Sequence, residues 1–361
     1  MKQTANIHLF KKQFDIFAKI IRYQMKTTRF LTAFLCMSLL FLSCNRDSTS
    51  YQKKLKVNTN TVPELVFDRY EDVLFQLDTA RFQEELMRVQ QDYLPFLGGD
   101  LSDPEAVNYL KGFAVDDFSL LLYSKVKAHY PDLKDVAAMV ETVYRHFNYY
   151  YPEIVLPEKV FTCVSGVNPE IPPVIVTDQG LVISLDWYLE DDEVYELIGM
   201  PKYRSERTSK MALVKDLGQQ LYETFVQADR RQTDLLAEMV ETGRRDLFVE
   251  AMYPEITDEV LLGYNKDQLQ WVRENEGNLW ADIVGTQTLY SSDFEAFRTF
   301  FADGPFTNEY SYDAPPRLGE YIGLQIVRSY FASHETSLRN LMQDNDLQGI
   351  FLDSGYKPKK Y

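Results

Sequence analysis

An apolar segment that ends at a cysteine sets the first boundary on what this chain can fold into. Residues 30–43 carry no charged side chain, and Lys26 and Arg29 precede them. The segment is too short to cross a bilayer as a permanent helix, so we expect an export signal that is cleaved. Ser43, a small residue, stands directly before Cys44, as in bacterial lipoproteins. Cys44 is therefore the expected lipidation site; an ordinary signal peptide or an anchor helix is the alternative.

The signal also predicts the domain boundaries. Met25 begins a normal signal with a short basic start, so we take it as the true first residue. We expect a signal peptide over residues 1–43, a polar lipidated tether over residues 44–61 and a single domain over residues 62–361. The partner of Cys44 is then the lipid bilayer, because two or three acyl chains such as palmitate anchor a protein stably where one chain does not.

The negative charge of the exported part argues against polyanionic partners. The whole chain has a formal net charge of −16, and residues 1–43 carry seven basic side chains and one acidic one, which leaves −22 for the remainder. Nucleic acids and anionic lipid head groups repel such a domain. We expect protein, glycan or cation partners, no nucleic acid and no cofactor. No acidic export cluster follows Cys44, so we expect the domain to face the periplasm.

The cysteine count indicates what must stabilise the domain. Cys36 lies in the signal, Cys44 is expected to carry lipid, and Cys163 is left alone. No disulfide can form within the domain, so its stability must come from a core. The 24 tyrosines and 23 phenylalanines provide material for that core. Cys163 is expected to be a buried apolar residue in a strand.

Helical patterns dominate the chain. A capping box at Ser102-Asp-Pro-Glu105 predicts a helix to about Ser124, and apolar spacing predicts the next helix over residues 132–147. A second capping box occurs at Ser292-Asp-Phe-Glu295. Further helices are expected over residues 208–227, 231–249, 266–283, 292–301, 317–333 and 336–344.

Three short β-branched runs interrupt the helices and predict a small sheet. They occupy residues 160–164, 173–177 and 181–185, and Asp178-Gln-Gly180 is a hairpin turn between the last two. The order is helices, one small sheet, then helices again. The fold class that this predicts is α+β, predominantly helical, with a small antiparallel or mixed sheet followed by a helical half.

The sequence lacks the motifs that mark several catalytic classes. The chain has no nucleophile elbow, phosphate-binding loop, dinucleotide fingerprint or Cys-x-x-Cys pair. His129, His146 and His334 lie too far apart for an H-E-x-x-H pair. The acidic run 190–193 lacks the alternating ligands and central glycine of a calcium loop, so we expect a solvated helix start there.

The C-terminal run Pro316-Arg-Leu-Gly-Glu-Tyr-Ile-Gly-Leu-Gln-Ile-Val-Arg-Ser-Tyr330 carries a family resemblance. The chain resembles the gliding-motility lipoprotein GldB family of Bacteroidetes over roughly residues 62–357. The other residues that carry the likeness are Phe67-Asp-Arg-Tyr70, Leu262-Gly-Tyr264, Trp271 with Asn275-Glu276, Trp280, Leu289-Tyr-Ser291 and Pro305-Phe306. The resemblance implies a lipid-anchored envelope protein associated with gliding and with the type IX secretion machinery. It implies no known reaction.

That family is in turn distantly similar to predicted zinc proteases, which implies a degenerate zincin-like fold. In those proteases the helix after the sheet carries two zinc-binding histidines and a glutamate that activates water. The nearest register places Lys215, Asp216 and Gln219 at these positions, and neither a protonated lysine nor a glutamine is a good zinc ligand. Glu241 stands where a third ligand is expected. We interpret the four residues as a vestigial cleft without a catalytic or metal role.

The expected helix over residues 317–333 has a structural explanation. Its apolar face is broad, and Gly319 and Gly323 allow another element to approach closely. Arg317 and Arg328 are expected to pair with carboxylates in a structural or interaction role.

These observations favour a lipid-anchored pseudoenzyme of the cell envelope that acts through contacts with envelope proteins, including gliding or secretion components. One alternative is a divergent metal-dependent hydrolase or protease with a site around Asp216, Glu241 and a histidine. Another is a peptide- or glycan-binding lipoprotein, in which the tyrosines of Asn148-Tyr-Tyr-Tyr151 and Tyr310-Ser-Tyr312 line a groove.

Replacing the expected lipidation site tests the anchor. In the variant Cys44→Ala no thiol is available for acylation, so we expect an unprocessed or soluble precursor. Fractionation into membrane and soluble parts, with the size of the chain on a gel, measures this. Normal processing and membrane retention of the variant would contradict lipidation at Cys44.

Overall fold

A small mixed sheet organises the computed structural model, which describes residues 48–58, 64–227 and 233–358. The strands are β1 (Val66–Arg69), β2 (Lys159–Cys163), β3 (Val174–Val176) and β4 (Leu181–Ser184), in the order β1-β2-β4-β3. β1, β2 and β4 are parallel, and β3 is antiparallel to β4. The β3–β4 hairpin has the predicted turn, where a Cβ on Gly180 would lie 2.9 Å from the carbonyl oxygen of Lys159.

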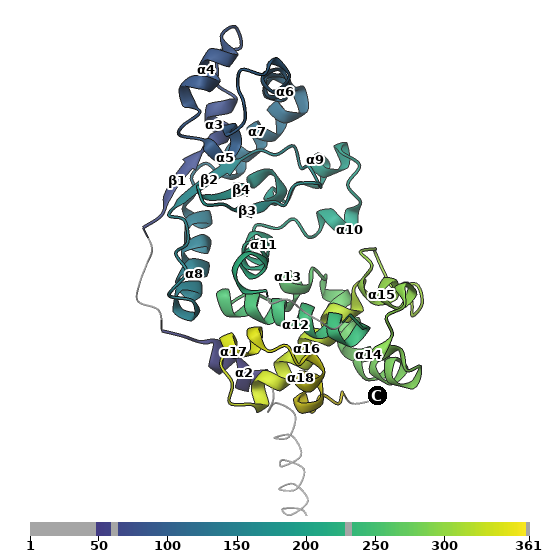
Figure 1. The fold of residues 1–361 in the computed structure, drawn as a ribbon. Helices are drawn as coiled ribbons and strands as arrows, with labels where there is room; N and C mark the ends of the chain where they lie inside the picture. Colours follow the sequence, from purple (N-terminus) through teal and green to yellow (C-terminus); the bar gives the residue numbers. More distant parts are fainter. Residues whose placement is uncertain (1–47, 59–63, 228–232, 359–361) are drawn as a thin grey trace, which may run out of the picture. The chain divides into compact units, whose positions relative to one another are not determined.

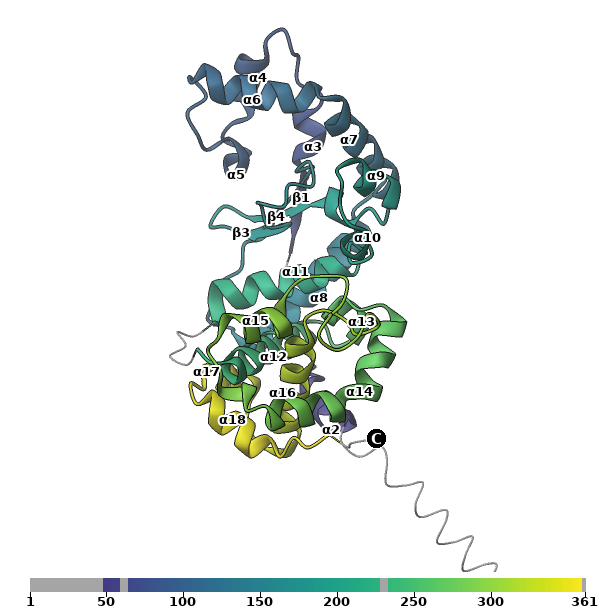
Figure 2. The same cartoon turned by 90° about the vertical axis from the view of Figure 1, so that its right-hand side faces the viewer.

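Helices cover both faces of the sheet (Figures 1 and 2). Alternate residues of a strand point to opposite faces, so Phe161 and Cys163 of β2 join one core and Val160 joins the other. Cys163 is buried in its strand, as predicted. The smaller core contains residues from α3 (Tyr70–Leu74), α4 (Phe82–Val89), α5 (Leu94–Leu97) and α6 (Pro104–Val115).

The larger core lies on the opposite face of the sheet and is mostly helical. The sheet side of this core is formed by α8 (Lys134–Tyr150) and α11 (Ala212–Leu221), which Figures 1 and 2 show below the strands. Its remaining helices are α2 (Ser48–Leu55), α7 (Asp117–His129), α9 (Asp192–Leu197), α12 (Leu235–Met252), α13 (Asp258–Leu262), α14 (Lys266–Gly285), α15 (Phe294–Phe301), α16 (Leu318–Ser333), α17 (Leu338–Gln343) and α18 (Leu347–Ser354). Three short turns complete it, namely η2 (Leu185–Tyr188), the π-helix η3 (Tyr222–Val226) and η4 (Thr288–Tyr290). The short helix α10 (Lys202–Ser205) packs beside α9.

Helices α12 and α16 pack against each other at very short range. A Cβ on Gly323 of α16 would lie 1.8 Å from the carbonyl oxygen of Met239 in α12. A Cβ on Gly243 of α12 would lie 2.3 Å from the backbone of Gly323. The two backbones therefore touch where both residues lack a side chain. Both helices are buried around most of their circumference, so they form the centre of the larger core.

The predicted fold class is confirmed, and several boundaries are corrected. The helix predicted from Ser102 to about Ser124 is two helices, because Asp116 has an extended backbone and caps α7 through the amide of Ser119. Asp103, and not Ser102, caps α6. At the second predicted capping box, Asp293 takes the N-cap position of α15 and no side chain caps the helix.

The folded part also begins earlier than predicted. Helix α2 lies within the segment that was expected to be a tether without regular structure. Tyr51 and Leu55 of this helix are buried in the larger core, and the Tyr51 hydroxyl donates to Glu250 of α12 at 3.1 Å. Residues 51–361 cluster as one compact unit. This helix was missed because most of its residues are polar, and only Tyr51 and Leu55, one turn apart, contribute to the core.

Two alanine substitutions in helices test the close packing of α12 and α16. Gly323→Ala forces the backbones apart, so we expect it to lower the free energy of unfolding by more than about 3 kcal/mol. Gly112→Ala in α6 meets no atom within 4 Å, so it should raise this free energy by about 0.5–1 kcal/mol. Urea unfolding followed by circular dichroism measures both. Equal effects of the two variants would contradict the contact.

Candidate functional site

Five charged side chains from three helices meet at a largely buried position. We define them as the charged cluster: Lys215 from α11, Arg245 and Asp246 from α12, and Arg317 and Glu320 at the start of α16. Arg245 lies 3.7 Å from Asp246 and 4.0 Å from Glu320, and Nη1 of Arg317 donates to Glu320 at 3.0 Å. Charged groups are rarely buried unless they are paired, so this concentration marks a structural or functional centre.

Arg317 is held in a conformation that costs energy. Its backbone is left-handed, with φ of 55°, which is unusual for a residue with a side chain. Its Nη2 donates to the carbonyl of Leu262 at 2.6 Å, and the Tyr264 hydroxyl donates to the carbonyl of Pro316 at 2.7 Å. A Cβ on Gly263 would lie 3.2 Å from Arg317 Nη2. Two segments that carry the family resemblance, 262–264 and 316–320, therefore meet at this residue.

Burial shifts two pKa values in the cluster toward each other. Desolvation lowers the pKa of Lys215, and the positive charge of Arg317 lowers it further. Desolvation raises the pKa of Asp246 to about 6, although Arg245 opposes this effect. Neither carboxylate oxygen of Asp246 has a hydrogen-bond partner among the described residues. A lysine and a carboxyl group that interact electrostatically and are perturbed in this way are typical of functional sites, where they accept or donate protons.

Asp216, the neighbour of Lys215 in the sequence, lies in a different environment. The Tyr188 hydroxyl donates to Asp216 Oδ2 at 2.6 Å, and desolvation raises the pKa of this carboxyl. Asp216 lines a cavity of about 230 Å³ together with Trp187, Arg204 and other residues. Adjacent positions of a helix point about 100° apart, which explains why the two side chains do not share a site.

Glu241 is engaged in a third set of contacts. The hydroxyl of Tyr222, the first residue of the π-helix, donates to Glu241 at 2.8 Å, and the buried Arg244 pairs with the other carboxylate oxygen. Arg244 also donates to carbonyls at the end of α17, including that of Leu341 at 3.2 Å. Gln219 lies one turn after Lys215 on the half-buried side of α11. The four residues of the expected vestigial cleft therefore do not form one hydrogen-bonded group.

The histidines have local partners in the described part of the chain. His146 contacts the carbonyl of Thr142 at 2.8 Å, and His334 stacks on Tyr330. His129 packs edge-on against Tyr130. Within residues 48–58, 64–227 and 233–358, no three His, Cys, Asp or Glu side chains are grouped as a metal ion requires.

The other α16 residues singled out from the sequence lie at packing contacts. A Cβ on Gly319 would lie 2.6 Å from the ring of Phe301, so α15 approaches closely at this position. Arg328 pairs with Glu250 at 2.9 Å and with Asp258 at 2.7 Å, which joins α16 to α12 and α13. Cys44 lies outside the described residues.

Sequence reasoning missed three members of the charged cluster, Arg245, Asp246 and Glu320. A signal for the first two was present, because Arg244-Arg245-Asp246 stands in the middle of a helix that is otherwise apolar on most sides. Charges in such a helix have to be buried and paired. Glu320 follows Arg317 by three residues, which is the spacing of a helical ion pair.

A comparison of the sequence with models of known protein families identifies the family of this chain. The family model described as "Gliding motility protein GldB" matches residues 52–358. The chain belongs to the gliding motility protein GldB family. The match begins within α2, one residue after Tyr51, so it includes Leu55, which is buried in the larger core. Membership associates the chain with gliding motility.

No curated protein and no solved structure matches the chain. The similarity to zincin-like proteases is therefore left as a proposal. None of the helices in the described segments combines the length and the apolarity that are needed to cross a membrane.

The buried carboxyl group of the charged cluster predicts a pH dependence. The pKa of Asp246 is raised in the folded state, so its contribution to stability is full below the unfolded-state pKa of about 4 and is lost as the pH rises through about 6. Asp246→Asn removes this contribution. From pH 4 to pH 7, we expect the free energy of unfolding of the wild type to fall relative to that of the variant by about 2 kcal/mol. Urea unfolding at intermediate pH values measures this, and parallel profiles would contradict it.

Proposed function

We propose that the protein is a lipid-anchored component of the cell envelope that serves gliding motility or type IX secretion through protein contacts and not through hydrolysis. In this proposal the chain is a zincin-like pseudoenzyme. Membership of the GldB family supports the association with motility. The residues on α11 and α12 at the expected ligand positions support the loss of catalysis.

The environment of Glu241 is the observation that carries the proposal. A carboxylate that binds a metal or activates water needs free lone pairs directed at the reaction site. Glu241 instead accepts a hydrogen bond from Tyr222 and pairs with Arg244, which is itself fully buried. The carboxylate thus neutralises the buried guanidinium of Arg244, which would destabilise the fold if it were unpaired. Its role is to join α12, the π-helix and α17.

The early start of the fold limits how far the domain can lie from the proposed lipid on Cys44. Seven residue steps separate Cys44 from Tyr51, and an extended chain covers at most about 3.6 Å per residue. In this proposal the backbone of Cys44 lies within about 25 Å of the backbone of Tyr51, which is buried in the larger core. This short connection favours partners that lie at or near the same membrane.

An amide replacement of Asp216 distinguishes the pseudoenzyme from the hydrolase alternative. Asp216→Asn keeps the hydrogen bond from Tyr188 but removes the carboxylate. We expect the variant to restore colony spreading and type IX cargo secretion in a strain that lacks the native gene, because no chemistry depends on this group. Gly323→Ala is the matched variant that should fail, since it disrupts the core.

Membrane retention and protein level are measured in the same strains. An Asp216→Asn protein that is present at the normal level in the membrane fraction and does not restore function would contradict the proposal. It would favour a hydrolytic site in the cavity beside Asp216.

A further inference from the structure

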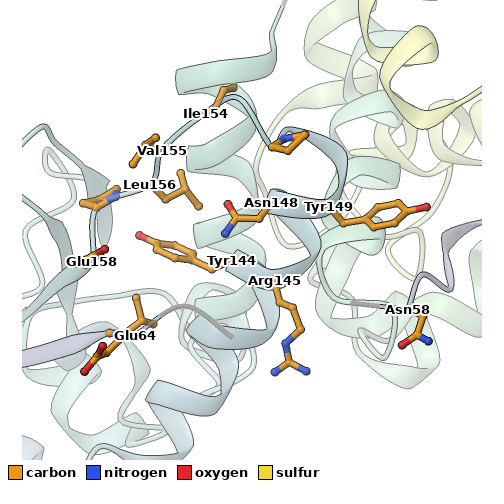
Figure 3. A pocket seen from close by; sticks show the side chains of 13 residues that line it. Asn58, Glu64, Tyr144, Arg145, Asn148, Tyr149, Ile154, Val155, Leu156 and Glu158 are labelled. Atoms are coloured by element: carbon orange, nitrogen blue, oxygen red, sulfur yellow. The ribbon is translucent and has the colours of Figure 1, made fainter. Parts of the chain in front are cut away.

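A groove of about 580 Å³ runs across the C-terminal half of α8. Figure 3 shows Tyr144, Arg145 and Asn148 projecting from this helix in the middle of the groove. The loop with Val155 and Glu158 forms one side, and Tyr149 lies on the other. The volume lies within the range of ligand-binding sites, which is about 300–1,000 Å³.

Arg145 differs from every other arginine in the described part of the chain. Each of the others forms at least one salt bridge there, and Arg145 forms none. Its Nε is buried and has no hydrogen-bond partner. In a chain with a net charge of −16, acidic side chains are plentiful. A guanidinium group that is left without one in a groove of this size is suited to an external carboxylate.

Further unsatisfied polar groups and apolar surface surround Arg145. The side chain of Tyr144 is 1% exposed, and its hydroxyl has no hydrogen-bond partner in the part of the chain that the structure describes. A buried hydroxyl without a hydrogen-bond partner costs about 1–3 kcal/mol of stability. The floor of the groove therefore contains a polar group that the fold itself does not satisfy. Val155 is 90% exposed and Tyr149 is 53% exposed. Large apolar side chains at the rim of a polar groove are typical of a protein-binding surface.

We propose that this groove binds a peptide segment of a partner protein and that Arg145 pairs with a carboxylate of that segment. Asn148 lies three residues after Arg145 on α8, so its amide is available to the backbone of the same ligand. Val155 and Tyr149 contact the apolar side chains on either side of the carboxylate. The inference rests on the proposed role as a protein-interaction component and names the chemistry of the partner.

The charges around the groove favour a peptide over other anionic ligands. Glu64 and Glu158 lie on the same side of the groove, and both are exposed. Their carboxylates repel a polyanion such as a nucleic acid or a phosphorylated lipid, whereas a single carboxylate beside neutral or basic groups fits. A neutral glycan would leave the guanidinium unpaired. The exposed side chain of Val155 and the half-buried side chain of Ile154 on the same loop also match apolar side chains of the ligand.

Peptide selection on the full chain, purified from membranes in detergent, tests the inference. The probe is a phage-displayed library of random dodecapeptides. We expect the enriched sequences to share an aspartate or glutamate flanked by apolar residues. The tightest peptide is then synthesised, and fluorescence anisotropy gives its affinity for the wild type, for Arg145→Gln and for Arg88→Gln. Arg88→Gln is the matched control, because it removes the same charge from an exposed position on α4.

The Arg145→Gln variant should bind at least about tenfold more weakly, since a charge-assisted hydrogen bond is lost, and Arg88→Gln should bind as the wild type does. An amide in place of the peptide carboxylate should weaken binding to the same extent. Failure to enrich any peptide, or equal affinity of the wild type and Arg145→Gln, would overturn the inference. These outcomes are independent of complementation by Asp216→Asn, so either proposal can fail alone.

Discussion

Gly243 of α12 and Gly323 of α16 meet backbone to backbone, and the two helices can lie this close only because neither residue has a side chain. This contact determines where the charged residues before and after it on α16 are placed. Toward the start of α16, Arg317 and Glu320 reach the charges of α12 and α11, and toward its end Arg328 reaches Glu250 and Asp258. Helix α16 is thus fixed by ion pairs at both ends and by close packing in the middle. Substitutions at this helix crossing should therefore disturb packing throughout the larger core.

The segments that carry the family resemblance are largely explained by this architecture. Tyr264 and the carbonyl of Leu262 hold Arg317 in its left-handed conformation, and Tyr321 donates to Glu276 at 3.2 Å. These are the contacts of a scaffold. The perturbed pKa values of Lys215 and Asp246 arise from the same burial, and the buried charges are balanced mainly within the cluster. Contacts with the proposed partners then depend on the surface, which includes the groove across α8.

The sequence predicted those elements whose signal is local. Helices α8, α12 and α14 and the β3–β4 hairpin follow from apolar spacing and turn residues, and they lie within a few residues of their predicted bounds. Strand β1 was missed, because it has only four residues, two of them charged, and is defined by pairing with β2 about ninety residues later. The charged cluster was found only in part for the same reason. Arg317 was singled out from its motif, but its connection to Arg245 through Glu320 and its electrostatic effect on Asp246 depend on how the helices pack.

The central claim is that the sites on α11 and α12 are structural, and the zinc content of the full chain tests it most directly. The protein is purified from membranes in detergent without chelator, dialysed against buffer with zinc and then without it, and measured by plasma mass spectrometry beside Glu241→Gln. The account predicts far less than one zinc per chain in both proteins, because Glu241 is engaged by Tyr222 and Arg244. One zinc per folded chain in the wild type, lost in a folded Glu241→Gln variant, would contradict it.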